Sequence, residues 1–276
     1  MELPRAKWRL IHTAASNGAW NMAVDEAVLE AVGRGDALPT LRLFAWAPTC
    51  LSLGYAQPIA DVDRPRLINH GWHLVRRPTG GKAILHTDEL TYTVVAPYSE
   101  PRLAGSILES YQRLSLALLK ALSLLGISAQ SLQKPSDTTR HDKHNPVCFE
   151  MPSNYEITVA GKKIIGSAQA RRQAGILQHG SLPLYGALSR ITDALSFPAE
   201  ETRDQVARRL NARATTVEQV LGYRVDWPTA AQAFATGFHQ ALNLELIHAE
   251  LTFPEQERAL QLVQEKYAHP DWTERI

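Results

Sequence analysis

Apolar residues near the start of the chain recur first at strand spacing and then at helix spacing. Trp8–His12 alternates apolar and polar positions and predicts a strand. Ser16 or Asn17 can cap the start of a helix that follows, and Gly33 and Gly35 mark its end. The apolar face of this predicted helix carries Met22, Ala23, Ala27, Val28 and Ala31.

Short β-like runs dominate the next part of the chain: Thr40–Trp46, Cys50–Tyr55, His73–Arg77, Lys82–His86 and Leu90–Ala96. A short helix beginning near Asp63 and Pro65 is expected to interrupt them. Ser106–Leu125 predicts a longer helix, because its apolar residues fall on one stripe and Gly126 follows as a stop.

Residues 131–147 break this pattern. They are polar and rich in proline and histidine, and they predict a long loop. Tyr155–Ala160 and Lys163–Ala170 flank Gly161 and Lys162 and predict a hairpin, and Gly175–Leu184 predicts a further strand.

The chain becomes helical in pattern from about Ala199, with Thr215, Thr216 and Asp226 as candidate caps. Strands interspersed with helices, followed by a helical region, are typical of a sheet with helices packed on it. The pattern therefore predicts an α/β (α+β) fold, a mixed β-sheet flanked by helices, with a helical C-terminal portion.

Composition narrows the class of protein. The 276 residues are 45% hydrophobic and 21% charged, with a net charge of +1, which gives no electrostatic reason to expect nucleic-acid or membrane binding. Charges interrupt the first ten residues, and no apolar run is long enough for a bilayer span, so we expect a cytoplasmic protein. The two cysteines, Cys50 and Cys148, are too few for a disulfide framework or a closed cysteine zinc site.

The first candidate site surrounds Gly80 and Gly81, which lie between β-like runs and follow Arg76 and Arg77. Adjacent glycines let a backbone approach a ligand closely, and the arginines could neutralise a phosphate or carboxylate. The same residues also fit a glycine turn between strands with arginines facing solvent, and both interpretations stay open.

The second candidate is Cys148, which follows the polar loop, whereas Cys50 lies in an apolar run and is the natural core residue. A reactive cysteine needs a nearby cation, histidine or helix N-terminus to lower its pKa. An inert, partly buried thiol is the alternative for Cys148.

Two further stretches carry candidate residues. Strand alternation turns either Lys162 or Lys163 inward among apolar residues, where an ammonium is costly without an anion. The small residues Gly166, Ser167 and Ala168 leave room for a bulky group beside the strand. A solvated hairpin tip with a small-residue strand fits equally, and His179 fits either a site or a structural histidine.

Taken in order and spacing, these stretches resemble the LipM-type octanoyltransferases, a family within the lipoate–protein ligase and biotin ligase superfamily. The resemblance runs from Trp8 to the C-terminus. It rests on these segments: Asn21-Met22-Ala23-Val24-Asp25-Glu26, Leu53-Gly54-Tyr55-Ala56-Gln57, residues 76–86, Glu89-Leu90-Thr91-Tyr92, Cys148-Phe149, Gly166-Ser167-Ala168-Gln169 with Arg171, residues 177–181, and Lys266-Tyr267 with Trp272.

The resemblance implies a biotin/lipoate protein ligase-like acyltransferase domain over residues 1–250, with residues 251–276 as a C-terminal helical extension packed on it. It implies that Cys148 carries an acyl thioester beside a functional Lys163. It also implies an acyl site lined by Arg77, Gly80, Gly81, His86, Gly166, Ser167 and Ala168. No metal and no cofactor are expected.

The implied reaction moves an octanoyl group from octanoyl-acyl carrier protein to Cys148, and then to a lysine of a lipoyl domain or the glycine cleavage H protein. Three alternatives stay open: an ATP-dependent lipoate–protein ligase, an octanoyl amidotransferase between lipoyl domains, and a non-catalytic homologue that binds or regulates a carrier. The presence of Cys148 favours a transferase over a ligase, because ligases of the superfamily do not depend on a cysteine at this position.

Overall fold

Two β-sheets form the framework of the protein. The computed structural model describes residues 3–133 and 155–276. The larger sheet has eight strands in the order β11-β1-β2-β6-β10-β9-β8-β7. Their bounds are β1 Ala6–His12, β2 Thr40–Phe44, β6 Glu89–Ala96, β7 Gln130–Gln133, β8 Tyr155–Val159, β9 Lys162–Arg172, β10 Gly175–Pro183 and β11 Leu244–His248. The strand β1 is parallel to β2 and β11, and the pairs from β2 onward to β7 are antiparallel.

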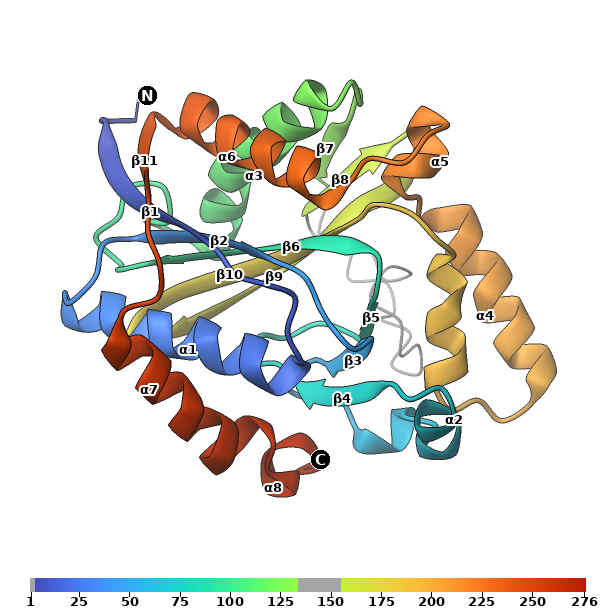
Figure 1. The fold of residues 1–276 in the computed structure, drawn as a ribbon. Coiled ribbons are helices and arrows are strands. Elements are labelled where there is room, and N and C mark those ends of the chain that lie inside the picture. The colour runs from blue at the N-terminus through green and yellow to red at the C-terminus, as the bar shows by residue number, and fades with distance from the viewer. Residues whose placement is uncertain (1–2, 134–154) are drawn as a thin grey trace.

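The smaller sheet has three strands in the order β4-β3-β5: β3 Cys50–Leu53, β4 His73–Arg76 and β5 Ile84–His86. The strand β3 is parallel to β4 and antiparallel to β5. This sheet lies beside the central strands of the larger one (Figure 1). Both sheets agree with the predicted mixed sheet.

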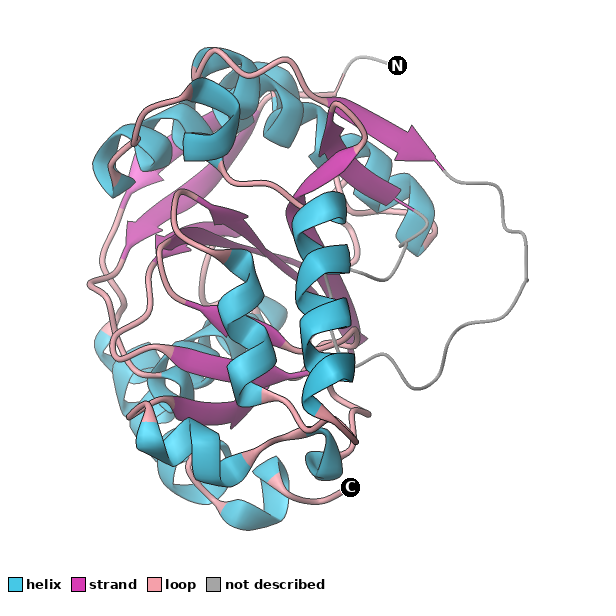
Figure 2. Cartoon of the chain, turned by 90° about the vertical axis from the view of Figure 1, so that its right-hand side faces the viewer, coloured by secondary structure: helices cyan, strands magenta, loops and turns pink. Residues whose placement is uncertain are grey.

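Helices cover both faces of the larger sheet. Helix α3 (Ile107–Leu124) and helix α6 (Trp227–Leu242) pack on one face, and α1 (Gly18–Arg34) and α7 (Phe253–Leu262) lie on the other (Figure 1). The shorter helices are α2 (Arg64–Asn69), α4 (Glu200–Arg213), α5 (Val217–Leu221) and α8 (Pro270–Thr273), with 3-10 turns at Ile59–Asp61 and Leu188–Ala194 and a π-helical turn at Val263–Tyr267. Figure 2 shows α4 beside the 3-10 segment Leu188–Ala194, with which it packs.

The helix boundaries follow from capping residues that the sequence displays. The Asn17 side chain accepts a hydrogen bond from the Trp20 N–H at the start of α1, and Gly35 ends this helix with φ +81°. Ser106 and Glu109 form a reciprocal capping box on α3. These predicted ends are therefore confirmed.

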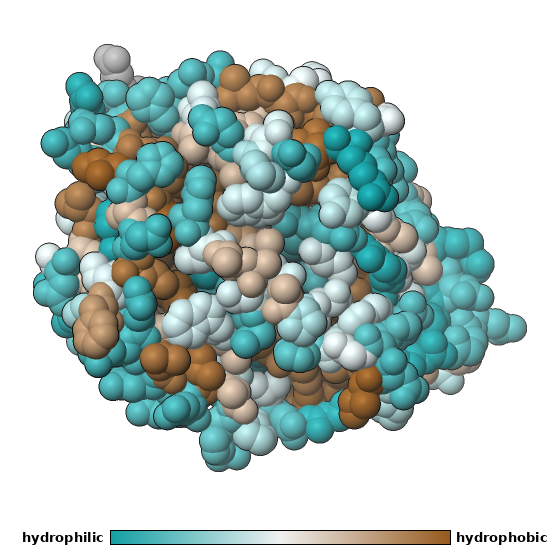
Figure 3. All heavy atoms as spheres, viewed as in Figure 1, coloured by the Kyte–Doolittle hydropathy of each residue, from teal (hydrophilic) through white to brown (hydrophobic). Residues whose placement is uncertain are grey.

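Apolar side chains fill the space between the layers. One cluster lies under α3 and α6 and includes the fully buried Trp8, Tyr92 and Phe234. A second cluster lies under α1, and a third joins the small sheet to α4. Hydrophilic residues dominate the outer surface of α4, at the right of the view in Figure 3. Within residues 3–133 and 155–276, no helix has the length and apolar character that a bilayer crossing requires.

The structure differs from the sequence prediction at two strands, β7 and β11. Residues 131–133 belong to β7 and not to a loop, and residues 134–147 of that predicted loop lie outside the described residues. The strand β11 interrupts the region predicted to be helical, where it pairs with β1 at the sheet edge. The hairpin turn falls on Ala160 and Gly161, one residue earlier than predicted, and both have positive φ, which suits a tight two-residue turn.

Candidate functional site

A pocket lies between the two sheets, where the small sheet faces the central strands of the large one. Its wall combines segments that are far apart in the chain. The lining residues are Met22, Trp46, Ser52, Arg77, Gly81, Ile84, His86, Thr91, Gly166, Ser167, Ala168, His179, Gly180 and Ser181.

The structure brings most of the predicted site residues to this pocket. Arg77, Gly81 and His86 line it from the small-sheet side. The small residues 166–168 of β9 line it from the large sheet. Gly80 and Lys163 line a wider groove that shares Gly81 and Ser167 with the pocket. Cys148 lies outside the described residues.

Arg77 holds the glycine loop in place. It is 2% exposed, and its Nη2 donates to the carbonyl oxygens of Gly80 at 2.9 Å and Lys82 at 2.7 Å. Its Nη1 donates to the backbone and side-chain oxygens of Ser52. Arg76 is fully buried and donates to the carbonyls of Gly54, Gln57 and Thr273. The expectation of solvent-facing arginines is wrong, because nearby loops supply backbone acceptors for both guanidinium groups.

His86 is fixed from both sides of its ring. Its Nδ1 lies 2.7 Å from Glu89 Oε1, and its Nε2 lies 2.8 Å from Ser52 Oγ. A carboxylate only accepts hydrogen bonds, so Nδ1 donates to Glu89, and Nε2 is hydrogen-bonded to the Ser52 hydroxyl. The indole of Trp46 stacks on the imidazole with 3.8 Å between ring centroids.

Glu89 is buried and accepts further hydrogen bonds from Thr91 at 2.5 Å and Ser181 at 2.7 Å. Burial alone would raise the pKa of this carboxyl. The charge and hydrogen bonds of its partners outweigh burial, so the pKa of Glu89 lies below its ordinary value. The group is therefore an ionised anchor for His86.

His179 belongs to a second buried chain of polar groups. Thr79 Oγ1 lies 2.7 Å from its Nε2, and Asp25 Oδ2 lies 3.4 Å from its Nδ1. Asp25 also pairs with the buried Arg42 at 2.7 Å. Burial lowers the pKa of His179, and Asp25 opposes that shift only in part, so the imidazole is neutral near pH 7.

The wall formed by β9 and β10 has no room for larger residues. A Cβ on Gly180 would lie 2.6 Å from Gly166 O and from Ser167 Oγ. The Tyr92 hydroxyl lies 2.7 Å from the same Ser167 Oγ. Burial raises the pKa of Tyr92 to about 12, so its phenol keeps its proton and positions Ser167.

Lys163 is the inward-facing lysine of the hairpin. It is 4% exposed, and its Nζ lies 3.4 Å from the carboxylate of the buried Glu156. Lys162 is half-buried as a residue, and its Nζ donates an exposed hydrogen bond to the Asn211 carbonyl. The register between β8 and β9 shifts at Ile157 and Thr158, which leaves Ile164 as an extra residue in β9.

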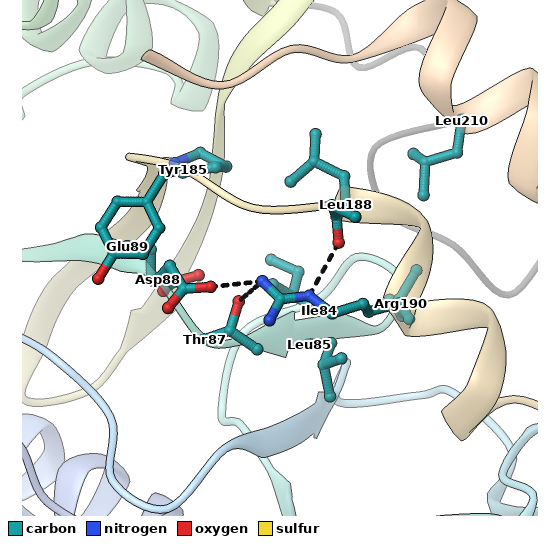
Figure 4. A pocket seen from close by; sticks show the side chains of 12 residues that line it. Ile84, Leu85, Thr87, Asp88, Glu89, Tyr185, Leu188, Arg190 and Leu210 are labelled. Atoms are coloured by element: carbon teal, nitrogen blue, oxygen red, sulfur yellow. Dashed lines mark hydrogen bonds and ion pairs between the residues drawn. The ribbon is translucent and has the colours of Figure 1, made fainter. Parts of the chain in front are cut away.

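A second pocket lies on the far side of β5 and is closed by Arg190, which donates to Asp88 and Thr87 (Figure 4). Leu188 and Leu210 contribute apolar walls there. It contains none of the predicted site residues.

Cys50 lies in the core, as predicted. Its side chain is fully buried at the start of β3, and burial raises the pKa of the thiol far above its ordinary value. This thiol is therefore unreactive in the folded protein.

Sequence reasoning missed Met22, Trp46 and Glu89 as parts of the site. Met22 lies on the face of α1 that was assigned to the core, and Trp46 ends a predicted strand. Glu89 follows His86 by three residues, and this spacing was the available signal for the pair.

Comparison with known proteins identifies a family model that matches most of the chain and several relatives that match nearly all of it. The model of the lipoyl protein ligase A/B catalytic domain matches residues 17–239. Octanoyltransferase LipM of Kyrpidia tusciae is 42% identical over 272 residues, covering 97% of this chain and 98% of that protein. Octanoyltransferase LipM of Symbiobacterium thermophilum is 40% identical over 277 residues, with 97% and 98% covered.

Solved structures share the fold at lower identity. A bipartite lipoate protein ligase from Thermoplasma acidophilum superimposes with a TM-score of 0.81 at 24% identity, covering 97% of this chain and 96% of that one. A lipoate-protein ligase A bound with ATP gives a TM-score of 0.79 at 24% identity, with 98% and 99% covered. The predicted ligase-like fold is therefore confirmed.

Proposed function

The chain belongs to the LipM octanoyltransferase family, which shares the lipoyl protein ligase A/B catalytic domain, and from that premise we propose that it transfers octanoyl groups during protein lipoylation. The donor is octanoyl-acyl carrier protein. The acceptor is a lysine of a lipoyl domain or of the glycine cleavage H protein. The observation that carries the proposal is the pocket between the sheets, which opens onto the groove where Lys163 lies.

The pocket suits an acyl chain because its polar residues bond to one another. Met22, Trp46 and Ile84 offer apolar surface, while His86 and Arg77 are engaged by protein acceptors. Burying about eight carbons at about 0.8 kcal/mol each supplies several kcal/mol of binding free energy. The thioester carbonyl then lies toward Gly81 and Ser167, at the opening.

In the first step the Cys148 thiolate attacks the carbonyl carbon of the donor thioester. A new C–S bond forms, the old C–S bond breaks, and the carrier leaves as a thiol after taking up a proton. In the second step the acceptor ε-amine attacks the acyl-Cys148 carbonyl, loses a proton, and the Cys148 thiolate is released. Both steps replace a thioester with an equal or more stable bond, so neither needs ATP.

Lys163 is proposed to stabilise the Cys148 thiolate and the oxyanion that forms on the carbonyl. The support is its position in the groove and its burial beside the Glu156 carboxylate, 3.4 Å from its Nζ. Lys163→Met should slow acylation at least tenfold, since a charge-assisted hydrogen bond contributes about 1.5–3 kcal/mol. Lys162→Met is the matched control and should retain the wild-type rate.

Intact-mass analysis tests the proposal. Protein mixed with octanoyl-acyl carrier protein, without ATP or magnesium, should gain one octanoyl group and pass it to a lipoyl domain. Cys148→Ala should gain none, whereas Cys50→Ala should still be acylated. Modification of the lipoyl domain by free octanoate with ATP, but not by the thioester donor, would instead identify a ligase.

The amidotransferase alternative needs a separate arm, because it also uses a cysteine. Octanoylated H protein should be a poor donor compared with octanoyl-acyl carrier protein. The reverse preference would place the chain among amidotransferases.

A further inference from the structure

The groove beside the acyl pocket is strongly cationic. Lys82, Lys163, Arg171 and Arg172 line it, and no aspartate or glutamate lies among its described lining residues. This contrasts with a whole-chain net charge of only +1. Positive charge is therefore concentrated where the acyl pocket opens.

Three of these cations have no carboxylate partner. Arg171 donates to two neutral acceptors, the Gln169 side chain at 3.1 Å and the Gly105 carbonyl at 2.6 Å, and its charge is one of the causes that lower the pKa of the nearby Glu109. Arg172 donates to the Pro78 carbonyl and lies over the Tyr55 ring at 5.1 Å. Together with Lys82, they form no ion pair within residues 3–133 and 155–276.

Two buried arginines elsewhere in the fold, Arg42 and Arg102, are instead paired at close range with Asp25 and Glu100. Arg275 adds to the positive field of the groove, because it stacks on Tyr55 with 3.8 Å from its guanidinium carbon to the ring centroid. The pKa of the Tyr55 phenol is lowered by these cations. The hydrogen bond and the charge of Arg275 lower it, and the charge of Arg172 lowers it further. Fixed cations that form no close ion pair favour an anionic ligand.

The position of the groove identifies the anion. The groove and the acyl pocket share Gly81 and Ser167, so a donor with its acyl chain in the pocket must extend along the groove. A thioester donor of the proposed reaction carries its acyl group on a phosphopantetheine arm, whose other end is a phosphate. The guanidinium fork matches the geometry of phosphate oxygens.

We propose that Lys82, Arg171 and Arg172 form a binding site for the phosphate of the donor's phosphopantetheine arm. This inference rests on the proposed octanoyl transfer and deepens it. The site holds the arm extended while the thioester lies at Gly81 and Ser167. Arg172 is the exposed member and Arg171 is fixed by neutral acceptors, so Arg172 is the residue to vary without disturbing the fold.

The test compares acyl-enzyme formation from octanoyl-pantetheine, which lacks the phosphate, with that from octanoyl-4′-phosphopantetheine. Wild type should prefer the phosphorylated donor in kcat/KM by about tenfold or more, the effect of one charge-assisted contact. Arg172→Gln should remove most of that preference and leave the rate with octanoyl-pantetheine within about twofold. Arg208→Gln, on the exposed face of α4, is the matched control and should keep the preference.

Octanoyl-coenzyme A and octanoyl-acyl carrier protein present the same arm from two sources. Arg172→Gln should slow both by a similar factor if it contacts the arm. Loss with the carrier protein alone would mean that Arg172 contacts the carrier surface and would overturn the phosphate site. Equal rates of wild type with both pantetheine donors would also overturn it, yet would leave octanoyl transfer intact. Failure of every donor to acylate the enzyme would instead refute the proposed function.

Discussion

Gly54 is predicted to hold the glycine loop of the site at its present position. It follows β3, and a Cβ built on it would lie 1.9 Å from Gly81 O and 2.8 Å from the Gly81 carbonyl carbon. Both are backbone atoms, so Gly54→Ala cannot be accommodated by a side-chain rotation. The loop would have to move away, and it would draw the Gly80 and Lys82 carbonyls from Arg77.

The expected cost has two parts. Overpacking a filled site costs about 1–3 kcal/mol, and each weakened hydrogen bond to a charged guanidinium adds about 1.5 kcal/mol. The sum is about 4–6 kcal/mol, so at about 2–4 °C for each kcal/mol in a chain of this size, Gly54→Ala should lower the Tm by about 8–24 °C. Acylation should fall about 100-fold, because the loop borders the reacting carbonyl and a shift of about 1 Å is costly.

Thermal unfolding by circular dichroism and single-turnover acylation measure these two effects. Gly80→Ala is the matched control for stability, since its Cβ would meet no atom within 4 Å. Its Tm should stay within about 2 °C of wild type, because alanine in place of glycine also lowers the entropy of the unfolded chain. A Gly54→Ala protein with unchanged Tm and acylation would refute the proposed packing of the loop.

Three further predictions follow from buried groups. The pKa of Glu89 is lowered in the fold, so its carboxylate stabilises the protein above about pH 4.3, its unfolded value, and this contribution is lost as pH falls through the folded-state pKa. Urea unfolding should therefore show a stability gap between wild type and Glu89→Gln that is wide at pH 7 and narrows by pH 3; a gap independent of pH would contradict the assignment. Glu255→Ala should cost about 3–5 kcal/mol by leaving the buried Arg9 unpaired, whereas Glu245→Ala at an exposed pair should cost under about 1 kcal/mol, and similar losses would contradict this reasoning. Iodoacetamide at pH 8 should alkylate one thiol of the native protein rapidly and Cys50 only after unfolding, because burial raises the pKa of Cys50; rapid alkylation of both would show that Cys50 is accessible.

The sequence predicts the central elements well because each carries its own signal. A cap, an apolar stripe and a glycine stop delimit α1 and α3, and runs of apolar residues delimit β3 and β6. The edge strands lack such signals. The strand β7 is short and mostly polar, and β11 follows a helix and has only Leu244 fully buried, so pairing with neighbouring strands defines both of them.

The residues of the site likewise fall into two groups, those that a local sequence motif marks and those that only tertiary packing brings to the pocket. Residues that a local motif marks, such as Gly81, His86 and Ser167, do meet at one pocket. Trp46 and Met22 reach it only because the small sheet packs against the large one, which no local spacing specifies. The burial of Arg76 likewise depends on the Thr273 carbonyl, and that of Arg77 on the Ser52 carbonyl, both of which are distant in sequence.

The pocket resolves an apparent conflict between its composition and its proposed ligand. A slot for an acyl chain contains Ser52, Arg77, His86 and Ser181, whose polar atoms would each cost about 1–3 kcal/mol if they faced hydrocarbon unpaired. Each of these side chains has a hydrogen-bond partner within the protein, and Glu89 alone accepts from His86 and Ser181. The groove differs in exposure, because Arg77 is buried whereas Arg171 is half-buried and Arg172 is exposed. Burial and hydrogen-bond pairing therefore make the pocket behave as apolar, and accessible cations make the adjoining groove favour anions, from similar residue types.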